Sequence, residues 1–306
     1  MGILVDLLSL LVMLGAFLLS YIQALYRVFV PVARKSVAGR RILITGAGHG
    51  LGRLMALAFA RLDAVLVLWD INKANNENTA REVAEVNAEV IVHTYTVDCS
   101  SSEAVTDAAQ RVTAEVGHVY MLVNNAGVLV GEDLLTLTDR DIRRTMDVNI
   151  MAHFWTLRNF LPDMLERNEG HVVSVASMAG KQGTHRLTDY CASKHAALGL
   201  NEALADEISR VYDKSGVLTT AVCPMFTDTG IIHGVNSRLG SETMMKAEAV
   251  VDRIVDGILR NETEILIPNG LCRIALLLKA LLPVSGYQAF LKANAITVPP
   301  QAKKTK

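Results

Sequence analysis

The sequence lacks a strong net charge, and this absence narrows the range of partners. Its 30 Lys and Arg residues face 31 Asp and Glu residues, which leaves a formal net charge of -1. A protein that binds nucleic acid needs an excess of positive charge to attract the phosphate backbone. The charge balance therefore argues against nucleic acid as a partner.

Cysteine is also scarce, and its spacing argues against a metal site. The chain has four cysteines that stand far apart: Cys99, Cys191, Cys223 and Cys272. No CxxC pair or Cys/His cluster offers the spacing of metal ligands, so we expect no bound metal. We interpret the four residues as free thiols, which favours a reducing compartment.

Internal repeats, long low-complexity tracts and interdomain linkers are missing too. The 306 residues are enough for one large domain. Hydrophobic residues make up 51% of the chain and the mean hydropathy is +0.29, which is high for a soluble enzyme, while charged residues still make up 20%. This combination predicts a globular domain with a membrane attachment.

The apolar excess is concentrated near the N-terminus. Residues 7–25 are 19 residues without a charge, about the length of helix that crosses a ~30 Å hydrocarbon core. No small-x-small cleavage site follows, so we expect an anchor that is retained, either spanning the bilayer or embedded in one monolayer. A basic cluster on the C-terminal flank predicts that the remaining chain faces the cytosol: Arg27, Arg34, Lys35, Arg40 and Arg41.

Beyond Gly39, short β-branched runs alternate with longer helical stretches, as in a parallel sheet covered by helices. The predicted strands are residues 41–45, 65–70, 90–97, 121–124, 171–176, 218–223 and 264–267. The predicted helices are residues 51–62, 78–87, 103–116, 139–165, 189–212 and 247–261. Thr138 and Asp141 form a capping pair at the start of the fourth helix.

These elements predict an α/β fold: a single Rossmann-type, doubly wound parallel sheet of about seven strands, preceded by a hydrophobic anchor helix. We divide the chain into an anchor with its basic flank (1–36), a dinucleotide-binding domain (37–270) and a C-terminal segment (271–306). The last part contains an apolar run interrupted by Arg273 and Lys279, typical of an amphipathic surface helix, and a solvated tail, KKTK.

A glycine-rich turn follows the first predicted strand directly. The pattern TGxxxGxG contains Thr45, Gly46, Gly50, Leu51 and Gly52, and a predicted helix follows it. Glycine allows the backbone to approach a pyrophosphate, whose charge meets the N–H groups and dipole of the helix N-terminus. The strand and helix on either side favour a dinucleotide site over a turn without a ligand.

The second predicted strand ends at Asp70, 18 residues after Gly52. An acid about 20 residues beyond the glycine turn binds the adenosine ribose in dinucleotide-binding folds. A carboxylate accepts hydrogen bonds from both ribose hydroxyls and repels a 2′-phosphate, so we expect NAD rather than NADP. The alternative is that Asp70 only caps the following helix.

A third group of residues has the chemistry for proton transfer. Tyr190 and Lys194 are four residues apart on a predicted helix and share one face, while Ser177 follows the fifth predicted strand. A phenol with a pKa near ~10 is a poor base at neutral pH, but an adjacent ammonium favours the phenolate.

Together these motifs resemble the short-chain dehydrogenase/reductase family over residues 37–268. The run Asn124–Gly127 and Asn149 in the phrase DVNI add to the resemblance. It implies that Tyr190 is the general acid/base and that Lys194 lowers its pKa and binds the nicotinamide ribose. It also implies that Ser177 holds the substrate oxygen and that Asn149 positions a water of the proton relay.

The resemblance implies further cofactor contacts. Asp98 would contact the adenine and Asn125 would border the cofactor. Pro224 and Thr229 are weaker candidates, because Pro224-Met225 stands where the family usually has Pro-Gly. The substrate lid is expected in the segment after the sixth strand, with the apolar residues Met225, Phe226, Ile231, Ile232, Met244 and Met245.

The anchor and the phrases GAGHGLGR, LWDINK, AHFWTLRNFLP and NSRLG are similar to a membrane-bound subgroup of 17-beta-hydroxysteroid and retinol dehydrogenases. This implies NAD-dependent oxidation of a lipophilic alcohol at the endoplasmic reticulum membrane or a lipid droplet, by a possible homodimer. Steroid and retinoid substrates both stay open. So do two other functions: a droplet surface protein that binds cofactor as structure, and an NADPH-linked carbonyl reductase.

Overall fold

The computed structural model describes all residues except 1, 31, 237–243, 295 and 302–306. The KKTK tail and most of the NSRLG phrase therefore lie outside the described residues. The chain forms two compact units, Met1–Lys35 and Ser36–Lys306. The first unit contains helix α1 (Gly2–Phe29). Its segment Leu8–Arg27 is long and apolar enough to cross a membrane, and none of it is buried.

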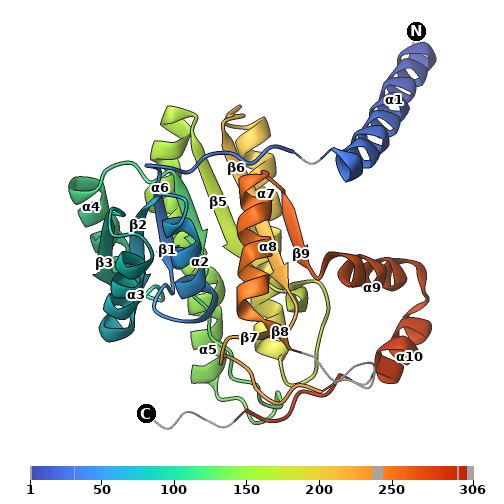
Figure 1. The fold of residues 1–306 in the computed structure, drawn as a ribbon. Helices are drawn as coiled ribbons and strands as arrows, with labels where there is room; N and C mark the ends of the chain where they lie inside the picture. Colours follow the sequence, from blue (N-terminus) through green and yellow to red (C-terminus); the bar gives the residue numbers. More distant parts are fainter. Residues whose placement is uncertain (1, 31, 237–243, 295, 302–306) are drawn as a thin grey trace. The chain divides into compact units, whose positions relative to one another are not determined.

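The second unit is built on a parallel sheet of seven strands in the order β3-β2-β1-β4-β5-β6-β9 (Figure 1). The strands are β1 (Arg41–Thr45), β2 (Val65–Asp70), β3 (Val92–Thr96), β4 (Met121–Asn124), β5 (Gly170–Val175), β6 (Val217–Pro224) and β9 (Glu264–Ile267). This confirms the predicted doubly wound fold. The strand order reverses between β1 and β4, and ligands bind at such a switch point, beyond the carboxyl ends of the strands.

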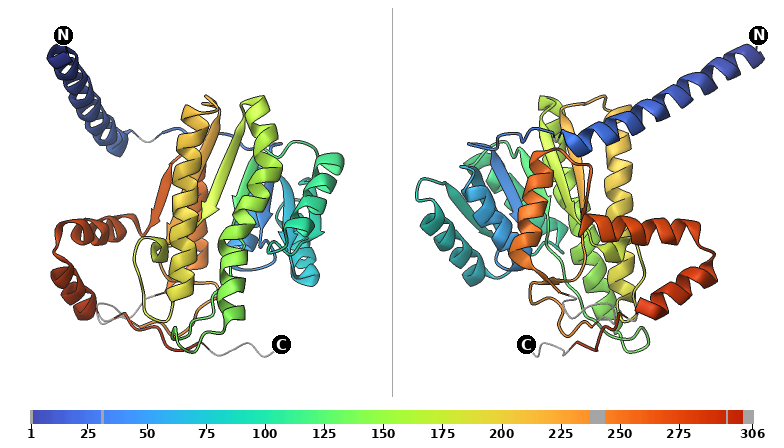
Figure 2. Two further views of the ribbon diagram at one scale, coloured as in Figure 1. Left: turned by 180° about the vertical axis from the view of Figure 1, so that it is seen from behind. Right: turned by 45° about the vertical axis from the view of Figure 1, so that its right-hand side comes forward.

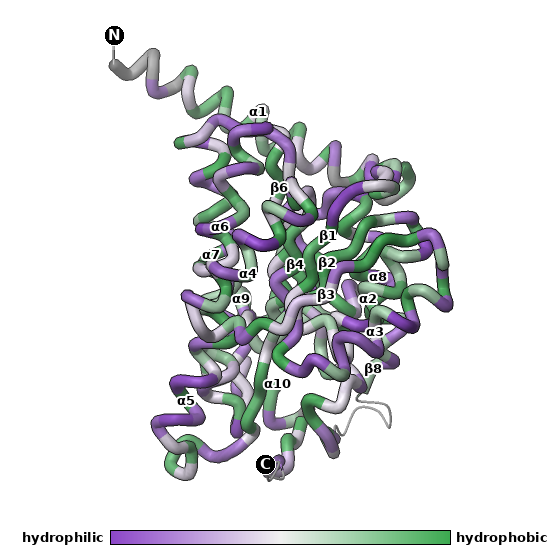
Figure 3. Tube along the Cα trace, turned by 90° about the vertical axis from the view of Figure 1, so that its left-hand side faces the viewer, coloured by the Kyte–Doolittle hydropathy of each residue, from purple (hydrophilic) through white to green (hydrophobic). Residues whose placement is uncertain are grey.

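Helices cover both faces of this sheet (Figure 2). The central strands β1, β2 and β4 are mostly apolar along both faces, which contributes to the green centre of Figure 3. Successive residues of β1 point to opposite faces: Ile42 and Ile44 belong to one core cluster and Leu43 to the other. The first cluster includes α2 (Gly50–Ala60), α3 (Lys73–Val86) and α8 (Ala247–Leu259); the second includes α4 (Ser102–Glu115), α6 (Ala152–Arg167) and α7 (Thr188–Arg210).

The helix predicted for residues 139–165 is interrupted in the structure. It consists of α5 (Asp139–Met146), a π-helical turn (Asp147–Met151) and α6. The predicted cap at its start is confirmed, because Thr138 Oγ1 accepts a hydrogen bond from the Asp141 amide at 3.2 Å. A π turn inside an α-helix often marks a functional site, and this one contains Asn149.

Two further helices follow the last strand. The predicted helix after Pro268 is present as α9 (Asn269–Leu281), and α10 (Val284–Asn294) follows it. The side chain of Cys272 on α9 is buried, whereas four apolar side chains of the same helix are more than half exposed: Leu271, Ile274, Leu277 and Leu281. All four cysteines are buried free thiols, as predicted.

Candidate active site

The glycine turn between β1 and α2 leaves no room for side chains. Gly46 and Gly50 have φ values of +66° and +55°, in the left-handed region that favours glycine. At Gly52 the conformation is ordinary, but a Cβ atom would lie 2.1 Å from the carbonyl oxygen of Gly46. This tight turn at a helix N-terminus is a suitable cradle for a dinucleotide pyrophosphate.

Asp70 lies beside the glycine turn, at the end of β2. Its Oδ2 atom accepts a hydrogen bond from the Gly48 amide at 2.8 Å, and its Oδ1 atom accepts one from the Asn72 amide at 2.8 Å. The N-cap of α3 is Asn72, whose side chain accepts from the Asn75 amide. The alternative that Asp70 caps this helix is therefore wrong. The cap also explains why α3 begins at Lys73, earlier than predicted.

Thr45 and Asn125 join the ends of β1 and β4 at the switch point. Thr45 Oγ1 accepts hydrogen bonds from the amides of Asn125 and Ala126, both at 3.0 Å. In return, Asn125 Nδ2 donates to the carbonyl oxygen of Thr45 at 2.8 Å. The two cofactor candidates thus hold the floor of the crevice in a fixed shape.

The other cofactor candidates lie on either side of the turn. Thr229 approaches it, because a Cβ atom on Gly50 would lie 3.3 Å from the Thr229 Cβ. A cavity of about 530 Å³ lies here, lined by the turn, by α3 and by the segment around Thr229. Asp98 follows β3 and accepts hydrogen bonds from the amide and hydroxyl of Ser100. Leu51 packs against the core behind the turn.

The three residues of the predicted proton-transfer group come from two elements. Ser177 follows β5, and its hydroxyl donates to the carbonyl oxygen of Pro224 at 3.3 Å. Tyr190 and Lys194 are on α7, with Lys194 Nζ 5.7 Å from the centre of the Tyr190 ring. Lys194 Nζ also donates to the carbonyl oxygen of Val175 at 2.7 Å.

Burial controls the acidity of this pair. It raises the pKa of Tyr190 to about 12, an effect that the hydrogen bond with Ser177 partly offsets. It also lowers the pKa of Lys194 to about 8, because the buried ammonium loses hydration. The sequence predicted that the Lys194 charge lowers the pKa of Tyr190; in the structure desolvation is the larger effect on both groups.

Asn149 connects three segments around this pair. Its side chain is fully buried; Oδ1 accepts from the Val128 amide at 2.8 Å and Nδ2 donates to the Val128 carbonyl oxygen at 3.0 Å. Nδ2 also donates to Ser193 Oγ at 3.0 Å, and Ser193 Oγ donates to the carbonyl oxygen of Tyr190 at 2.8 Å. Asn149 therefore fixes the loop after β4 relative to the turn of α7 that carries Tyr190 and Lys194.

Sequence reasoning missed one residue of this network, Ser193, and the burial of a histidine near Lys194, His153. Ser193 stands between Tyr190 and Lys194 in the chain, and only the fold reveals that it bridges to Asn149. His153 is 2% exposed, and neither ring nitrogen has a hydrogen-bond partner among the described residues. Burial and the nearby Lys194 charge lower its pKa to about 3, so the ring is neutral. Its spacing of four residues from Asn149 was the available signal.

The expected lid residues pack in three places, and Ile231 is exposed. Met225, which replaces the usual glycine, packs against a cluster around Cys272 and Leu266. Ile232, Phe226 and Met244 belong to or pack against an apolar cluster that also contacts Tyr190, whereas Met245 packs against the main core. Residues 237–243 of the expected lid lie outside the described residues.

Comparisons with known proteins agree with this geometry. Residues 40–240 match the family model for short chain dehydrogenase. Estradiol 17-beta-dehydrogenase 11 of Pongo abelii is 44% identical over 265 residues, which cover 87% of each chain. 17-Beta-hydroxysteroid dehydrogenase 13 of Homo sapiens is 42% identical over 262 residues, which cover 86% of each chain.

Solved structures share the fold. A short chain dehydrogenase/reductase from Burkholderia phymatum, in complex with NAD, matches with a TM-score of 0.71 and 26% identity, over 89% of this chain and 99% of the other. Another matching structure, a metagenomic short-chain oxidoreductase, is a complex with NADP. Both of these neighbours therefore hold a nicotinamide dinucleotide.

Proposed function

This chain belongs to the short-chain dehydrogenase family, and we propose that it is an NAD-dependent alcohol dehydrogenase that oxidises a lipophilic alcohol, a 17-beta-hydroxysteroid or a retinol. One observation carries the proposal. Ser177, Tyr190 and Lys194 come together at the carboxyl edge of the sheet, where Tyr190 packs against an apolar cluster. Proton-transfer groups thus lie beside a surface suited to a lipophilic substrate.

Each polar residue has a distinct role in this proposal. Tyr190 Oη accepts the proton of the substrate hydroxyl, and the Ser177 hydroxyl holds the same oxygen in place. Lys194 is buried next to the tyrosine ring, so its charge acts through a medium of low dielectric and favours the phenolate. Asn149 holds the segments together and provides a place for the relay water in its π turn.

The geometry around the glycine turn supports the proposed cofactor residues. Thr45, Gly46, Gly50, Leu51, Gly52 and Asn125 shape the pyrophosphate cradle and its floor; Asp98, Pro224 and Thr229 border the remaining cofactor. The nicotinamide, when bound, accepts the hydride from the carbinol carbon. Asp70 supports NAD, because its carboxylate lies against the glycine turn where a 2′-phosphate would be repelled.

The names of the relatives favour the steroid over the retinoid. The two relatives described above are an estradiol 17-beta-dehydrogenase and a 17-beta-hydroxysteroid dehydrogenase. We therefore propose a steroid alcohol as the first substrate to test. Oxidation is the proposed direction, because NAD is the expected cofactor.

We also propose that α1 attaches the enzyme to the endoplasmic reticulum membrane or a lipid droplet, with the catalytic unit in the cytosol. The exposed apolar surface of Leu8–Arg27 and the basic residues after it support this location. Leu14→Arg with Leu18→Arg tests it, since each arginine at the centre of a bilayer costs about 3 kcal/mol. The double variant should move into the soluble fraction, while Val211→Arg, on the exposed end of α7, should stay with membranes.

We also propose a homodimer that forms through α6 and α7.

The deciding experiment measures NADH formation by membranes that contain the full chain, supplied with NAD and either estradiol or all-trans-retinol. Tyr190→Phe membranes are the blank, because this substitution removes only the hydroxyl. Turnover that depends on Tyr190 supports the proposal and identifies the substrate branch. If NAD binds but neither alcohol reacts above the blank, the result supports the alternative of a droplet surface protein that binds cofactor as structure. A preference for NADPH and a ketone would instead support the carbonyl reductase.

A further inference from the structure

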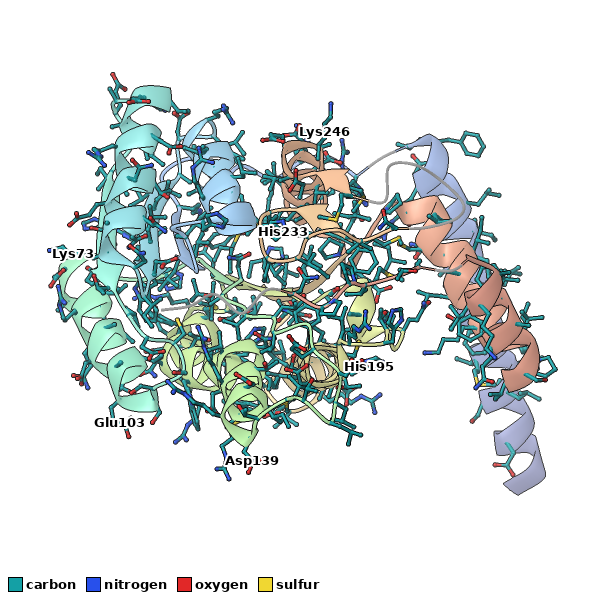
Figure 4. All side chains as sticks on the ribbon, turned by 90° about the horizontal axis from the view of Figure 1, so that it is seen from below. Lys73, Glu103, Asp139, His195, His233 and Lys246 are labelled. Atoms are coloured by element: carbon teal, nitrogen blue, oxygen red, sulfur yellow. The ribbon has the colours of Figure 1, made fainter. Side chains whose placement is uncertain are left out.

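The last described residues of the chain, 296–301, cross the carboxyl edge of the sheet below the strands in the view of Figure 1. We call this segment the C-terminal strap. Figure 4 looks at the molecule from that side and labels His233, which contacts the strap. The sequence ITVPPQ contains no catalytic motif, and sequence reasoning gave it no role in the site.

The strap is attached to the lid segment by backbone hydrogen bonds. The Thr297 amide donates to the carbonyl oxygen of Asn236 at 2.8 Å, and the Asn236 amide donates to the carbonyl oxygen of Thr297 at 3.1 Å. This reciprocal pair is an antiparallel bridge. It joins residues that are far apart in the chain and holds the strap beside the lid.

A second attachment is made by the loop that precedes α7. Arg186 Nη1 donates to the carbonyl oxygen of Val298 at 2.8 Å, and the Val298 amide donates to His185 Nε2 at 3.3 Å. Arg186 has a φ of +61°, a conformation that a non-glycine residue rarely adopts, and its guanidinium also pairs with Asp133 at 3.3 Å. Arg186 therefore holds the carbonyl group of Val298, and His185 holds its amide.

A third attachment is made by Gln301. Its side-chain amide both accepts from the His233 amide at 2.8 Å and donates to the His233 carbonyl oxygen at 3.1 Å. Its backbone amide donates to the carbonyl oxygen of Gly131, in the loop after β4, at 3.1 Å. Gly131 has no room for a side chain, because a Cβ atom would lie 2.3 Å from Gln301 Cγ. The strap therefore ties together three segments: the lid segment, the loop before α7 and the loop after β4.

The apolar side of the strap and the catalytic tyrosine of the proposed mechanism share one apolar cluster. Val298 is 0% exposed and belongs to a cluster with Leu187, Cys191, Ile232 and Val235. Tyr190 and Ile296 pack against this cluster. A substrate hydroxyl must come within about 3 Å of Tyr190 Oη for proton transfer. The carbon skeleton of that substrate must then lie next to Tyr190, whose apolar surroundings are the side chains of this cluster.

We propose that the C-terminal strap is a wall of the alcohol-binding site and that Val298 is a specificity-determining residue for bulky lipophilic alcohols. This inference rests on the proposed alcohol dehydrogenase function. The strap has no group that could transfer a proton, so it acts on substrate binding and not on the chemical step. Its three attachments set the distance between this wall and Tyr190.

The test compares a bulky alcohol with a small one, estradiol and cyclohexanol, in Val298→Ala, Val298→Trp and wild-type membranes. One methylene in an apolar pocket changes kcat/KM by about 10-fold to 200-fold. We expect both variants to lower kcat/KM for estradiol at least tenfold, mainly through KM, with less than a twofold change for cyclohexanol and for the KM of NAD. Val211→Ala, at an exposed site, is the matched control.

Gln301→Ala is the second test, because it loosens the strap without altering the apolar cluster. It should raise KM for estradiol severalfold and leave kcat for cyclohexanol unchanged. Equal losses for both alcohols, or no change in any of the three strap variants, would overturn the proposal. If wild-type membranes turn over neither alcohol, the proposed function itself fails. Equilibrium dialysis of labelled estradiol with the same variants then tests the role of the strap in substrate binding. Weaker estradiol binding in both Val298 variants supports this role, and unchanged binding overturns it.

Discussion

The Oδ2 atom of Asp70 accepts a hydrogen bond from the amide of Gly48 at 2.8 Å. The same carboxylate thus shapes the glycine turn and presents its charge where the adenosine ribose of a dinucleotide would lie. In the proposed function, one residue would therefore couple the conformation of the pyrophosphate cradle to the choice between NAD and NADP. This relationship leads to the first prediction.

Asp70→Asn should shift the preference from NAD towards NADP. The amide keeps an oxygen that can accept from Gly48 but loses the charge that repels a 2′-phosphate. A charge-assisted hydrogen bond contributes about 1.5–3 kcal/mol, so kcat/KM for NAD should fall by about 10-fold to 100-fold. Steady-state rates with both cofactors measure the ratio. An unchanged NAD/NADP ratio would show that Asp70 does not select the cofactor.

The rate of alcohol oxidation should rise with pH and then level off. Oxidation needs Tyr190 as phenolate and, in the proposed mechanism, Lys194 as ammonium. With the pKa of Tyr190 at about 12, the phenolate fraction grows tenfold per pH unit. With the pKa of Lys194 at about 8, the charged lysine decreases by the same factor above pH 8. We expect log kcat/KM to rise with a slope near 1 below about pH 8 and to plateau above it. A slope that continues past pH 9 would contradict the role of Lys194.

Gly52→Ala should destabilise the cradle strongly. The new methyl group would lie 2.1 Å from the backbone oxygen of Gly46, which cannot move without distorting β1. Overpacking of this kind costs about 1–3 kcal/mol or more. Thermal unfolding should show a lower Tm, and calorimetry should show at least tenfold weaker NAD binding. Gly183→Ala is the control, since nothing lies within 4 Å of its added carbon; equal effects at both sites would refute the steric argument.

His153→Leu should make the fold less sensitive to acid. Burial lowers the pKa of His153 to about 3, below its ordinary value of 6.5. Between these values only the unfolded chain takes up the proton, so the folded state loses up to about 1.4 kcal/mol per pH unit as the pH falls below 6.5. A leucine side chain does not titrate, so it removes this pH-dependent loss of stability. It also removes the two buried ring nitrogens that lack hydrogen-bond partners among the described residues. Urea unfolding from pH 7.5 to 4.5 should show a flatter decline for His153→Leu than for wild type or for His195→Leu, at an exposed position. Parallel declines in all three proteins would contradict the prediction.

Much of the candidate cofactor site could be predicted from the sequence. The strands at Arg41–Thr45 and Val65–Asp70 have the predicted bounds, because fully buried parallel strands are apolar runs that glycine or polar residues end. The glycine turn and Asp70 follow from local spacing, and so does the pairing of Tyr190 with Lys194 on one helix face. These features depend on residues close together in the chain, where geometry is set by the period of the helix or strand.

Three features were decided only by the tertiary structure. The balance of pKa effects at Tyr190 and Lys194 depends on burial, which no local pattern measures. The Ser193 bridge to Asn149 needs α7 and the π turn to be neighbours. The strap joins the apolar cluster beside Tyr190 only because residues 296–301 pair with Asn236, His185 and Gly131 across long stretches of chain. Local sequence specifies the secondary-structure elements and the dinucleotide motif, since both arise from short-range periodicity and backbone freedom. The shape of the alcohol site was decided by long-range packing, because its walls come from segments that only the closed fold brings together.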